Sequence, residues 1–260
     1  MITASAVALA SMLAQASPST VAPPPACPTA QDSPDVGQLV ARTEAMMKGG
    51  TSKSTMEMTI KTPSFTRKLK LKTMTKGDDY ALVRIVEGGP RETGMMTLKR
   101  EKQLWNYLPQ AGRVMKLPSG MLGDSWMGSD FTNDDLVQGT SLSKDFTATA
   151  SPIDVDGKKA WHVVLTPTKT AVVVWGKIEL DVDRATCTPI SERFFDEDNK
   201  LARKMTFSNF KQVGWRTMAM TMTVAPGTPG RETTVQYDDI AFDVDVPDDT
   251  FTVHRLEQGR

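Results

Sequence analysis

The sequence predicts a mainly β protein with few helices, built on an antiparallel sheet that curls on itself. Three observations support this prediction: about ten short segments alternate apolar and polar residues, turn residues separate them, and one amphipathic helix precedes them. A sheet with this many strands leaves unpaired edges, which curling or closure protects. One face must then be filled by side chains, covered by helices or left as a cavity.

The elements follow in chain order. A helix is expected over 35–50, because apolar residues recur at helical spacing between Pro34-Asp35 and the pair Gly49-Gly50. A second, short helix is expected near Asp134, and these two helices are available to cover the concave face. Strands are expected at 55–61, 68–72, 82–86, 95–99, 103–108, 161–166, 177–183, 190–195, 201–207, 217–224 and 233–237.

The first residues differ from the rest. Residues 2–16 carry no charge and end in Ala14-Gln15-Ala16, which is typical of a secretory signal peptide over 1–16, although a buried helix is the alternative. Residues 17–34 are rich in Pro, Ala and Ser and are expected to form a disordered tether. Cys27 lies in this tether. It could pair with Cys187 in an exported protein, or anchor the chain to a membrane through a lipid.

Charge and composition exclude several classes of function. The 31 basic and 31 acidic residues give no net charge, which disfavours nucleic acid as a partner. Two cysteines and two histidines lie too far apart for a zinc site, and no Gly-rich phosphate loop precedes a helix. No metal and no cofactor are therefore expected.

The segment 123–136, GDSWMGSDFTNDDL, has the composition of an active site. Its first six residues hold one residue too many for the G-x-S-x-G elbow of a serine hydrolase, and its acidic residues lack the spacing of a calcium loop. Thr132 and Asp135 instead match a capping box at a helix start. Trp126, Met127 and Phe131 are then expected to anchor the segment to the sheet. Arg113 and Lys116 lie close enough in sequence to pair with Asp124 or Asp130.

Methionine is unusually frequent, with 16 residues. Several alternate along strands, and a flexible thioether adapts to apolar ligands of different shapes. Filling of a core is the alternative. The residues predicted to contact a ligand are Met56, Met58, Trp126, Met127, Phe131, Met218, Met220 and Met222.

The strings LWNYLP at 104–109 and SWMGSDFTNDDL at 125–136, with Arg113 between them, resemble the outer-membrane lipoprotein-sorting protein family, whose members are LolA-like periplasmic proteins. The resemblance spans about 35–257 and implies a single domain with a LolA/LolB-like, incomplete antiparallel β-barrel whose helices cover the concave face. It implies a non-enzymatic periplasmic carrier of lipid or lipoprotein acyl chains, with an inner-membrane exporter complex as a possible partner. The alternatives are an exporter accessory protein without lipid cargo and, more remotely, an envelope lipid hydrolase.

Overall fold

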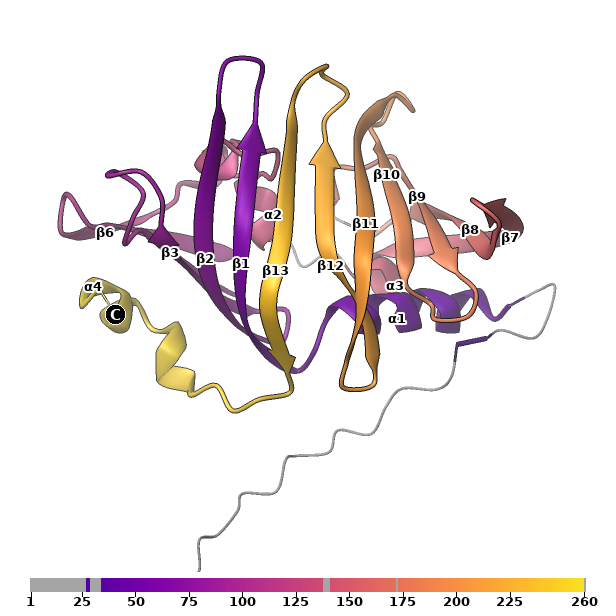
Figure 1. Cartoon of the computed structure of the whole chain (residues 1–260), viewed down its shortest axis with the longest axis horizontal. Helices are drawn as coiled ribbons and strands as arrows, with labels where there is room; N and C mark the ends of the chain where they lie inside the picture. The colour runs from indigo at the N-terminus through magenta and orange to yellow at the C-terminus, as the bar shows by residue number, and fades with distance from the viewer. Residues whose placement is uncertain (1–26, 29–33, 138–140, 172, 260) are drawn as a thin grey trace, which may run out of the picture.

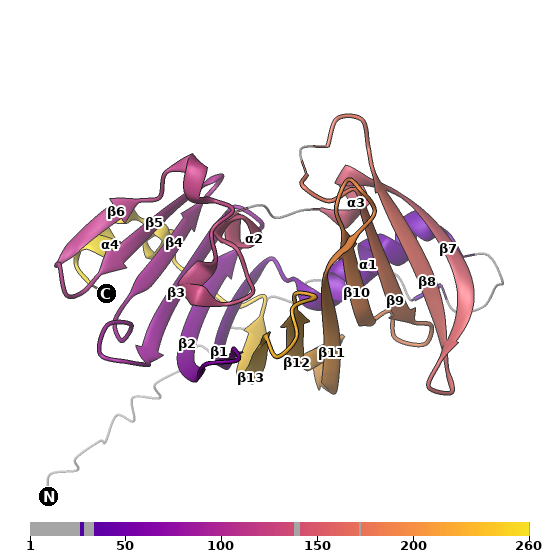
Figure 2. The same cartoon turned by 90° about the horizontal axis from the view of Figure 1, so that it is seen from above.

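The computed structural model describes residues 27–28, 34–137, 141–171 and 173–259 (Figure 1). At its centre is one antiparallel sheet of 13 strands in the order β6-β5-β4-β3-β2-β1-β13-β12-β11-β10-β9-β8-β7. The sheet curls into an open trough, and its two outer strands do not pair with each other (Figure 2). The predicted incomplete antiparallel barrel is therefore confirmed.

The strands have the following bounds: β1 (Thr51–Lys61), β2 (Thr66–Lys76), β3 (Tyr80–Glu87), β4 (Met96–Arg100), β5 (Gln103–Leu108), β6 (Arg113–Lys116), β7 (Phe146–Val155), β8 (Lys158–Pro167), β9 (Lys177–Asp183), β10 (Pro189–Phe195), β11 (Leu201–Val213), β12 (Arg216–Ala225) and β13 (Glu232–Phe242). The helices are α1 (Val36–Met47), α2 (Asn133–Val137), α3 (Leu142–Asp145) and α4 (Val253–Glu257), with 3-10 turns η1 (Ser119–Met121), η2 (Trp126–Gly128) and η3 (Asp248–Phe251).

The strand order determines where the barrel is open. β1 to β6 form one meander and β7 to β13 form another, and the first and last strands join them in the middle of the sheet. The outer edges, β6 and β7, are therefore consecutive in the chain. The connection between them has to pass from one edge of the trough to the other, and it carries η1, η2, α2 and α3.

α1 covers the half of the sheet formed by β7 to β12. The helix begins where the Asp35 carboxylate accepts a hydrogen bond of 3.0 Å from the Gln38 amide, which satisfies a free donor of its first turn. Its buried face includes Leu39 and Val40, which join the core of that half. At its other end the Arg216 guanidinium donates to the carbonyl of Ala45 at 3.1 Å and so holds the helix terminus against β12.

The other half of the sheet has a core on each face. On the concave face, methionine and leucine side chains of β1 and β2 pack around Trp126 of the connection. On the opposite face, Leu82 and Leu98 pack with Phe251 and Leu256 from the C-terminal η3 and α4. Thr97 contacts the Trp126 indole and so lies on the concave face. Because successive strand residues point to opposite faces, its neighbour Leu98 lies on the other face.

Both predicted helices are present, and every predicted strand coincides with an observed one. β6, β7, α3 and α4 were not predicted. β7 reads FTATASPIDV, in which small residues and Pro152 hide the alternation, and proline is tolerated there because β7 is an edge strand. The predicted signal peptide and most of the predicted tether lie outside the described residues. No helix in the described part of the chain is long and apolar enough to span a membrane.

Candidate functional site

The connection between β6 and β7 enters the concave side of the trough (Figure 2). Trp126 anchors it there, in the core formed with β1 and β2. This indole is 3% exposed, and its Nε1 donates to the Thr97 hydroxyl of β4 at 3.1 Å. Next to it, Met127 takes a left-handed backbone conformation with φ of 53° and offers its carbonyl to Arg67 of β2. The aromatic anchor predicted from the sequence therefore packs the connection against β2 and β4.

The capping box at the start of α2 is confirmed. The Thr132 amide donates to the Asp135 carboxylate at 2.8 Å, and the Asp135 amide donates to the Thr132 hydroxyl at 3.1 Å. The same carboxylate also accepts two hydrogen bonds of 2.7 Å from the Arg203 guanidinium of β11. Asp135 thus both starts the helix and fastens it to the opposite half of the sheet.

The surroundings of Asp135 change its acidity. Burial by itself raises the pKa of this carboxyl, but the hydrogen bonds and charge of Arg203, helped by Thr132, outweigh burial and hold the pKa below its usual value. Arg203 in turn lies over the rings of Phe194 and Trp175, with its guanidinium carbon 4.5 and 4.8 Å from their centroids. The ion pair therefore sits directly on the aromatic wall of the adjoining space.

A second ion pair holds the connection to β13. The Asp130 carboxylate pairs with Arg231 and accepts a hydrogen bond of 2.7 Å from the Thr233 hydroxyl. The prediction that Asp130 could pair with Arg113 or Lys116 is wrong. Those cations are near in sequence, but β6 lies at the edge of the sheet while the segment reaches to its middle.

A cavity of about 380 Å³, open on one side, lies between α1, α2, α3 and strands β9 to β11. Its volume is within the range of about 300–1,000 Å³ that is usual for small-molecule sites. Most of its wall is apolar, and the described lining residues are Thr43, Glu44, Met47, Lys48, Phe131, Asp135, Leu136, Leu142, Trp175, Ile178, Pro189, Glu192, Phe194, Arg203 and Met205. The cavity faces the concave side of the trough.

The helices α2 and α3 form the cover of this cavity, and a polar contact fastens each of them. Asp135 holds α2 to β11, as described above. Glu44 of α1 accepts hydrogen bonds from the amides of Leu142 and Ser143, at 2.8 and 3.2 Å, at the start of α3. Side-chain hydrogen bonds thus tie α2 to β11 and α3 to α1.

Glu192 is a wall residue whose carboxyl loses its proton near neutral pH. Burial raises the pKa of its carboxyl to about 7, and the positive charge of Arg203 opposes this rise. A carboxyl that is partly neutral adds little charge to the wall, so the apolar character of the cavity is largely kept.

Comparison with known proteins identifies the family of this chain and the fold that it shares with solved structures. The sequence model of one family, described as "Uncharacterized protein", matches residues 77–258, which is well over half of the chain. The chain belongs to this family. No curated protein matches it.

Solved structures show that this family member has a LolA-like fold. A DUF1329 family protein from Desulfovibrio piger is 22% identical, with a TM-score of 0.76, over 87% of this chain and 100% of that one. A domain from Vibrio parahaemolyticus, described as a candidate outer membrane lipoprotein-sorting protein, is 24% identical, with a TM-score of 0.71, over 85% of this chain and 97% of that one. A LolA superfamily protein from Nitrosomonas europaea is 18% identical, with a TM-score of 0.68, over 84% and 97%. These likenesses establish the fold.

The predicted ligand-contact residues of this LolA-like protein fall into two groups. Met56, Met58, Trp126, Met218 and Met220 are buried, and Met127, Phe131 and Met222 are half-buried. Only Phe131 lines the apolar cavity, while the buried ones of the first strand belong to the core around Trp126. A ligand contact by any of the eight remains a prediction.

The sequence interpretation missed most of the cavity wall. Phe194 and Met205 lie in predicted strands, but nothing local distinguishes a side chain that lines a cavity from one that fills a core. Trp175 lies in the loop before β9, where an isolated aromatic residue was the only signal.

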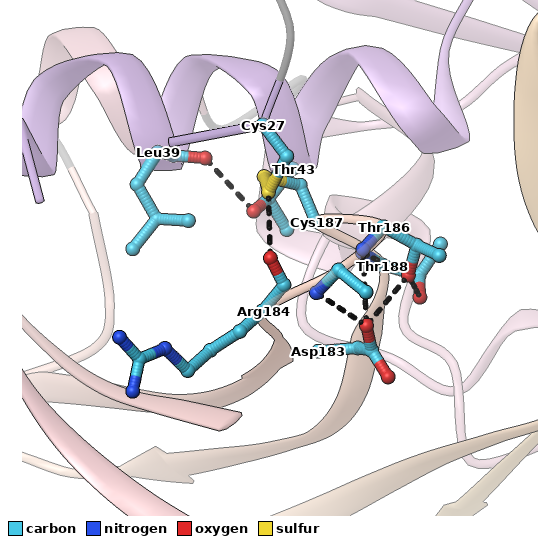
Figure 3. Close-up of a disulfide and its surroundings, with 9 residues drawn as sticks. Cys27, Leu39, Thr43, Asp183, Arg184, Thr186, Cys187 and Thr188 are labelled. Atoms are coloured by element: carbon cyan, nitrogen blue, oxygen red, sulfur yellow. Dashed lines mark hydrogen bonds between the residues drawn. A yellow bond between two sulfur atoms is a disulfide. The ribbon is translucent and has the colours of Figure 1, made fainter. Parts of the chain in front are cut away.

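Cys27 and Cys187 form a disulfide, with their Cα atoms 5.7 Å apart (Figure 3). Cys187 is fully buried in a turn that Asp183 holds by accepting from the amides of Ala185 and Thr186 at 2.8 and 3.0 Å. The bridge ties residue 27 to the core beside α1. The pairing that the sequence left open is thus formed, and in this state the Cys27 sulfur is not free to carry a lipid.

The serines of the connection make local structural bonds. The Ser125 hydroxyl donates to the carbonyl of Ser129, and the Ser129 hydroxyl donates to the carbonyl of Trp126 at 2.7 Å. His162 is half-buried, and its Nδ1 lies 2.9 Å from the Asp181 carboxylate of β9. In the described chain neither serine has a histidine as a hydrogen-bond partner, so the geometry offers no support for a serine hydrolase here.

Proposed function

We propose that this protein is a non-enzymatic periplasmic carrier that shields the acyl chains of lipids or lipoproteins. It acts as one LolA-like domain over residues 35–257. The observation that carries the proposal is the cavity of about 380 Å³, whose wall is mostly apolar and whose cover is tied by side chains. The likeness in fold to a candidate outer membrane lipoprotein-sorting domain supports the same conclusion.

The energetics of acyl burial fit a carrier. Each buried methylene contributes about 0.8 kcal/mol, so roughly ten methylenes give about 8 kcal/mol before the costs of binding are subtracted. Binding of this strength is reversible, which a carrier needs at the point of transfer. Met47 and Met205 in the wall can adapt to chains of different length and branching.

Two features support export to the periplasm. The first is the leader expected over 1–16, and the second is the disulfide between Cys27 and Cys187, which is typical of an oxidising compartment. An anchor through a lipidated Cys27 is incompatible with the disulfide-bonded form.

The test begins with protein purified from an envelope fraction, analysed by native mass spectrometry and by lipid extraction. We expect a co-purified acyl ligand, or uptake of an added fluorescent fatty acid. Leu142→Trp, which fills the cavity from α3, should reduce this binding while keeping the melting temperature. Leu201→Trp, a change on an exposed leucine outside the cavity wall, is the matched control.

The proposal is overturned if no acyl ligand is found or bound, or if Leu142→Trp binds as well as the control. Stable capture of an inner-membrane exporter by protein that contains no lipid would favour the accessory role instead. Loss of a measured lipid hydrolysis in Ser125→Ala would favour the hydrolase.

A further inference from the structure

A second pocket lies beside the apolar cavity, and its floor carries hydroxyl groups and a lysine among apolar side chains. It has a volume of about 230 Å³ and shares Met47, Lys48 and Leu136 with the cavity, so the two spaces adjoin. Its floor is the concave face of β1 to β4 at the end where α1 meets β1. The strand residues that line this pocket are Ser52, Ser54, Thr73, Thr75, Tyr80, Ala81 and Lys99 of β1 to β4, together with Tyr237, Ile240 and Phe242 of β13.

The concave face changes character along β1. Its inward residues are Ser52 and Ser54 at one end, followed by Met56, Met58 and Ile60 at the other. The paired strand β2 repeats this change, with threonines opposite the serines and leucines opposite the methionines. One surface therefore presents hydroxyls at one end and apolar side chains at the other, which is the polarity of an amphiphile.

Lys99 is the charged strand residue at the polar end of this face, and Lys48 and Asp78 also line the pocket. It is only 6% exposed and lies in the row of paired residues that contains Ser52, Thr75 and Ala81. Within the described residues its ammonium makes no hydrogen bond and no ion pair. The side chain is thus largely buried while its ammonium faces the pocket without a partner among the described residues, so a ligand that supplied a negative charge there would gain a charge-assisted contact.

The hydroxyls beside Lys99 have protons to donate. Ser52 bonds to Thr75 at 2.7 Å and Ser54 bonds to Thr73 at 2.6 Å, and each pair uses one of its two hydroxyl protons. In the described part of the chain these hydroxyls make no other side-chain bonds, so each pair keeps one proton available for an acceptor in the pocket. Hydroxyl donors around a cation form a site for an anion.

The charges around the pocket are consistent with a site for an anion. Burial lowers the pKa of the Lys99 ammonium, Asp78 and Asp79 oppose this shift, and Lys48 adds to it. Asp78 pairs with Lys48 at 3.2 Å on the exposed rim and not with Lys99. Asp78 lines the pocket and acts on Lys99 through its charge, but among the described residues its carboxylate pairs with Lys48, and Lys99 forms no ion pair.

We propose that this pocket binds the anionic head group, a carboxylate or phosphate, of an acyl amphiphile whose chain lies in the adjoining apolar cavity. Lys99 supplies the charge, the serine and threonine hydroxyls supply hydrogen bonds, and the chain passes Met47 and Leu136. This inference rests on the proposed carrier function and narrows its ligand to anionic lipids.

The test compares a charged probe, dansyl-aminoundecanoic acid, with its uncharged methyl ester, which is larger by one methyl group, by fluorescence titration. Wild-type protein should bind the acid at least about tenfold more tightly than the ester, a ratio that corresponds to about 1.4 kcal/mol. Lys99→Met removes the ammonium, keeps the length of the side chain and should abolish this preference. Lys102→Met, on an exposed lysine in the adjacent turn, should keep it. Thermal denaturation confirms that both variants fold.

The outcomes separate the two proposals. If Lys99→Met leaves the preference for the acid unchanged, or weakens both probes equally, the head-group site is refuted while the carrier proposal stands. If neither probe binds the wild type, both proposals fail. If inorganic phosphate alone binds in a manner that depends on Lys99 and displaces neither probe, the pocket is a site for a free anion, and the lipid head group is refuted.

Discussion

The ion pair between Asp135 and Arg203 gives the sharpest prediction about stability. Asp135→Asn leaves the Arg203 guanidinium, whose side chain is 10% exposed, without its counter-charge. The lost contact comprises two hydrogen bonds of 2.7 Å. Hydrogen bonds to charged groups contribute about 1.5–3 kcal/mol each, and the remaining amide and the 20% exposure of the Asp135 side chain reduce the total. We expect a loss of about 2–4 kcal/mol.

The assay is thermal and guanidinium unfolding followed by circular dichroism at neutral pH. For a chain of this size, each kcal/mol shifts the melting temperature by about 2–4 °C, so the expected fall is about 10 °C. Asp134→Asn is the matched control, because Asp134 lies in the same first turn of α2 and makes no side-chain hydrogen bond among the described residues. The control should cost less than about 1 kcal/mol, the usual limit of the helix-dipole effect at the surface.

A second variant and a pH series complete this test. Adding Arg203→Met to Asp135→Asn should recover part of the loss, because no buried charge then remains unpaired. The pKa of Asp135 is lowered in the folded state, so its stabilisation is present above the unfolded value near 3.8 and is lost as pH falls through the folded pKa. Asp135→Asn should therefore lose less stability in acid than wild type. Equal stability of the Asp135 and Asp134 variants, or a double variant that loses the sum of both single effects, would refute the reasoning.

Three further predictions concern Trp126, the disulfide and Glu192 in the cavity wall. Trp126→Ala should cost about 3–5 kcal/mol by emptying the core around β1, whereas Trp126→Phe should lose mainly the bond to Thr97, about 1 kcal/mol; equal losses in chemical denaturation would contradict this. Reduction of the bridge between Cys27 and Cys187 should cost about 2–5 kcal/mol, and Cys27→Ser should make unfolding insensitive to reductant. A Cys27→Ser variant that still responds to reductant would show that another effect is at work. Because the folded pKa of Glu192 is raised from 4.5 to about 7, its contribution to stability should decline as pH rises between these values. Glu192→Gln should thus match wild type in acid and exceed it above neutral pH, and parallel pH profiles would argue against the raised pKa.

The sequence was most informative where the signal is local. The helix α1 follows from Asp35 at its start and from apolar residues at helical spacing, and the strands follow from their alternation. The capping box of Thr132 and Asp135 was readable because its members are three residues apart. Edge strand β7 was not predicted because most of its residues are small or polar. It is a strand because it pairs with β8, not because of its composition.

The candidate site was much less predictable. Methionines on an alternating strand were compatible both with a core and with a cavity, and the structure buries Met56 and Met58 in a core while placing Met205 in the cavity wall. The partner of Asp130 is 101 residues away, and that of Asp135 is 68 residues away, so neither could be inferred from neighbours in sequence. Nothing in the sequence distinguishes Lys99 from a solvent-exposed strand lysine, and its burial in the pocket wall follows from its position in the sheet.

By itself, the sequence determined the fold class, the two helices that cover the trough, and the polar and apolar faces of the strands, because each depends on residues a few positions apart. Only the tertiary structure decided that β1 joins β13, which leaves the opening between β6 and β7 and sends the connection across the concave face. That topology brings α1, α2 and β11 together around one cavity and sets Lys99 in a polar pocket beside it. Cavities arise between elements, and their walls are fixed by packing over long separations that no local pattern records.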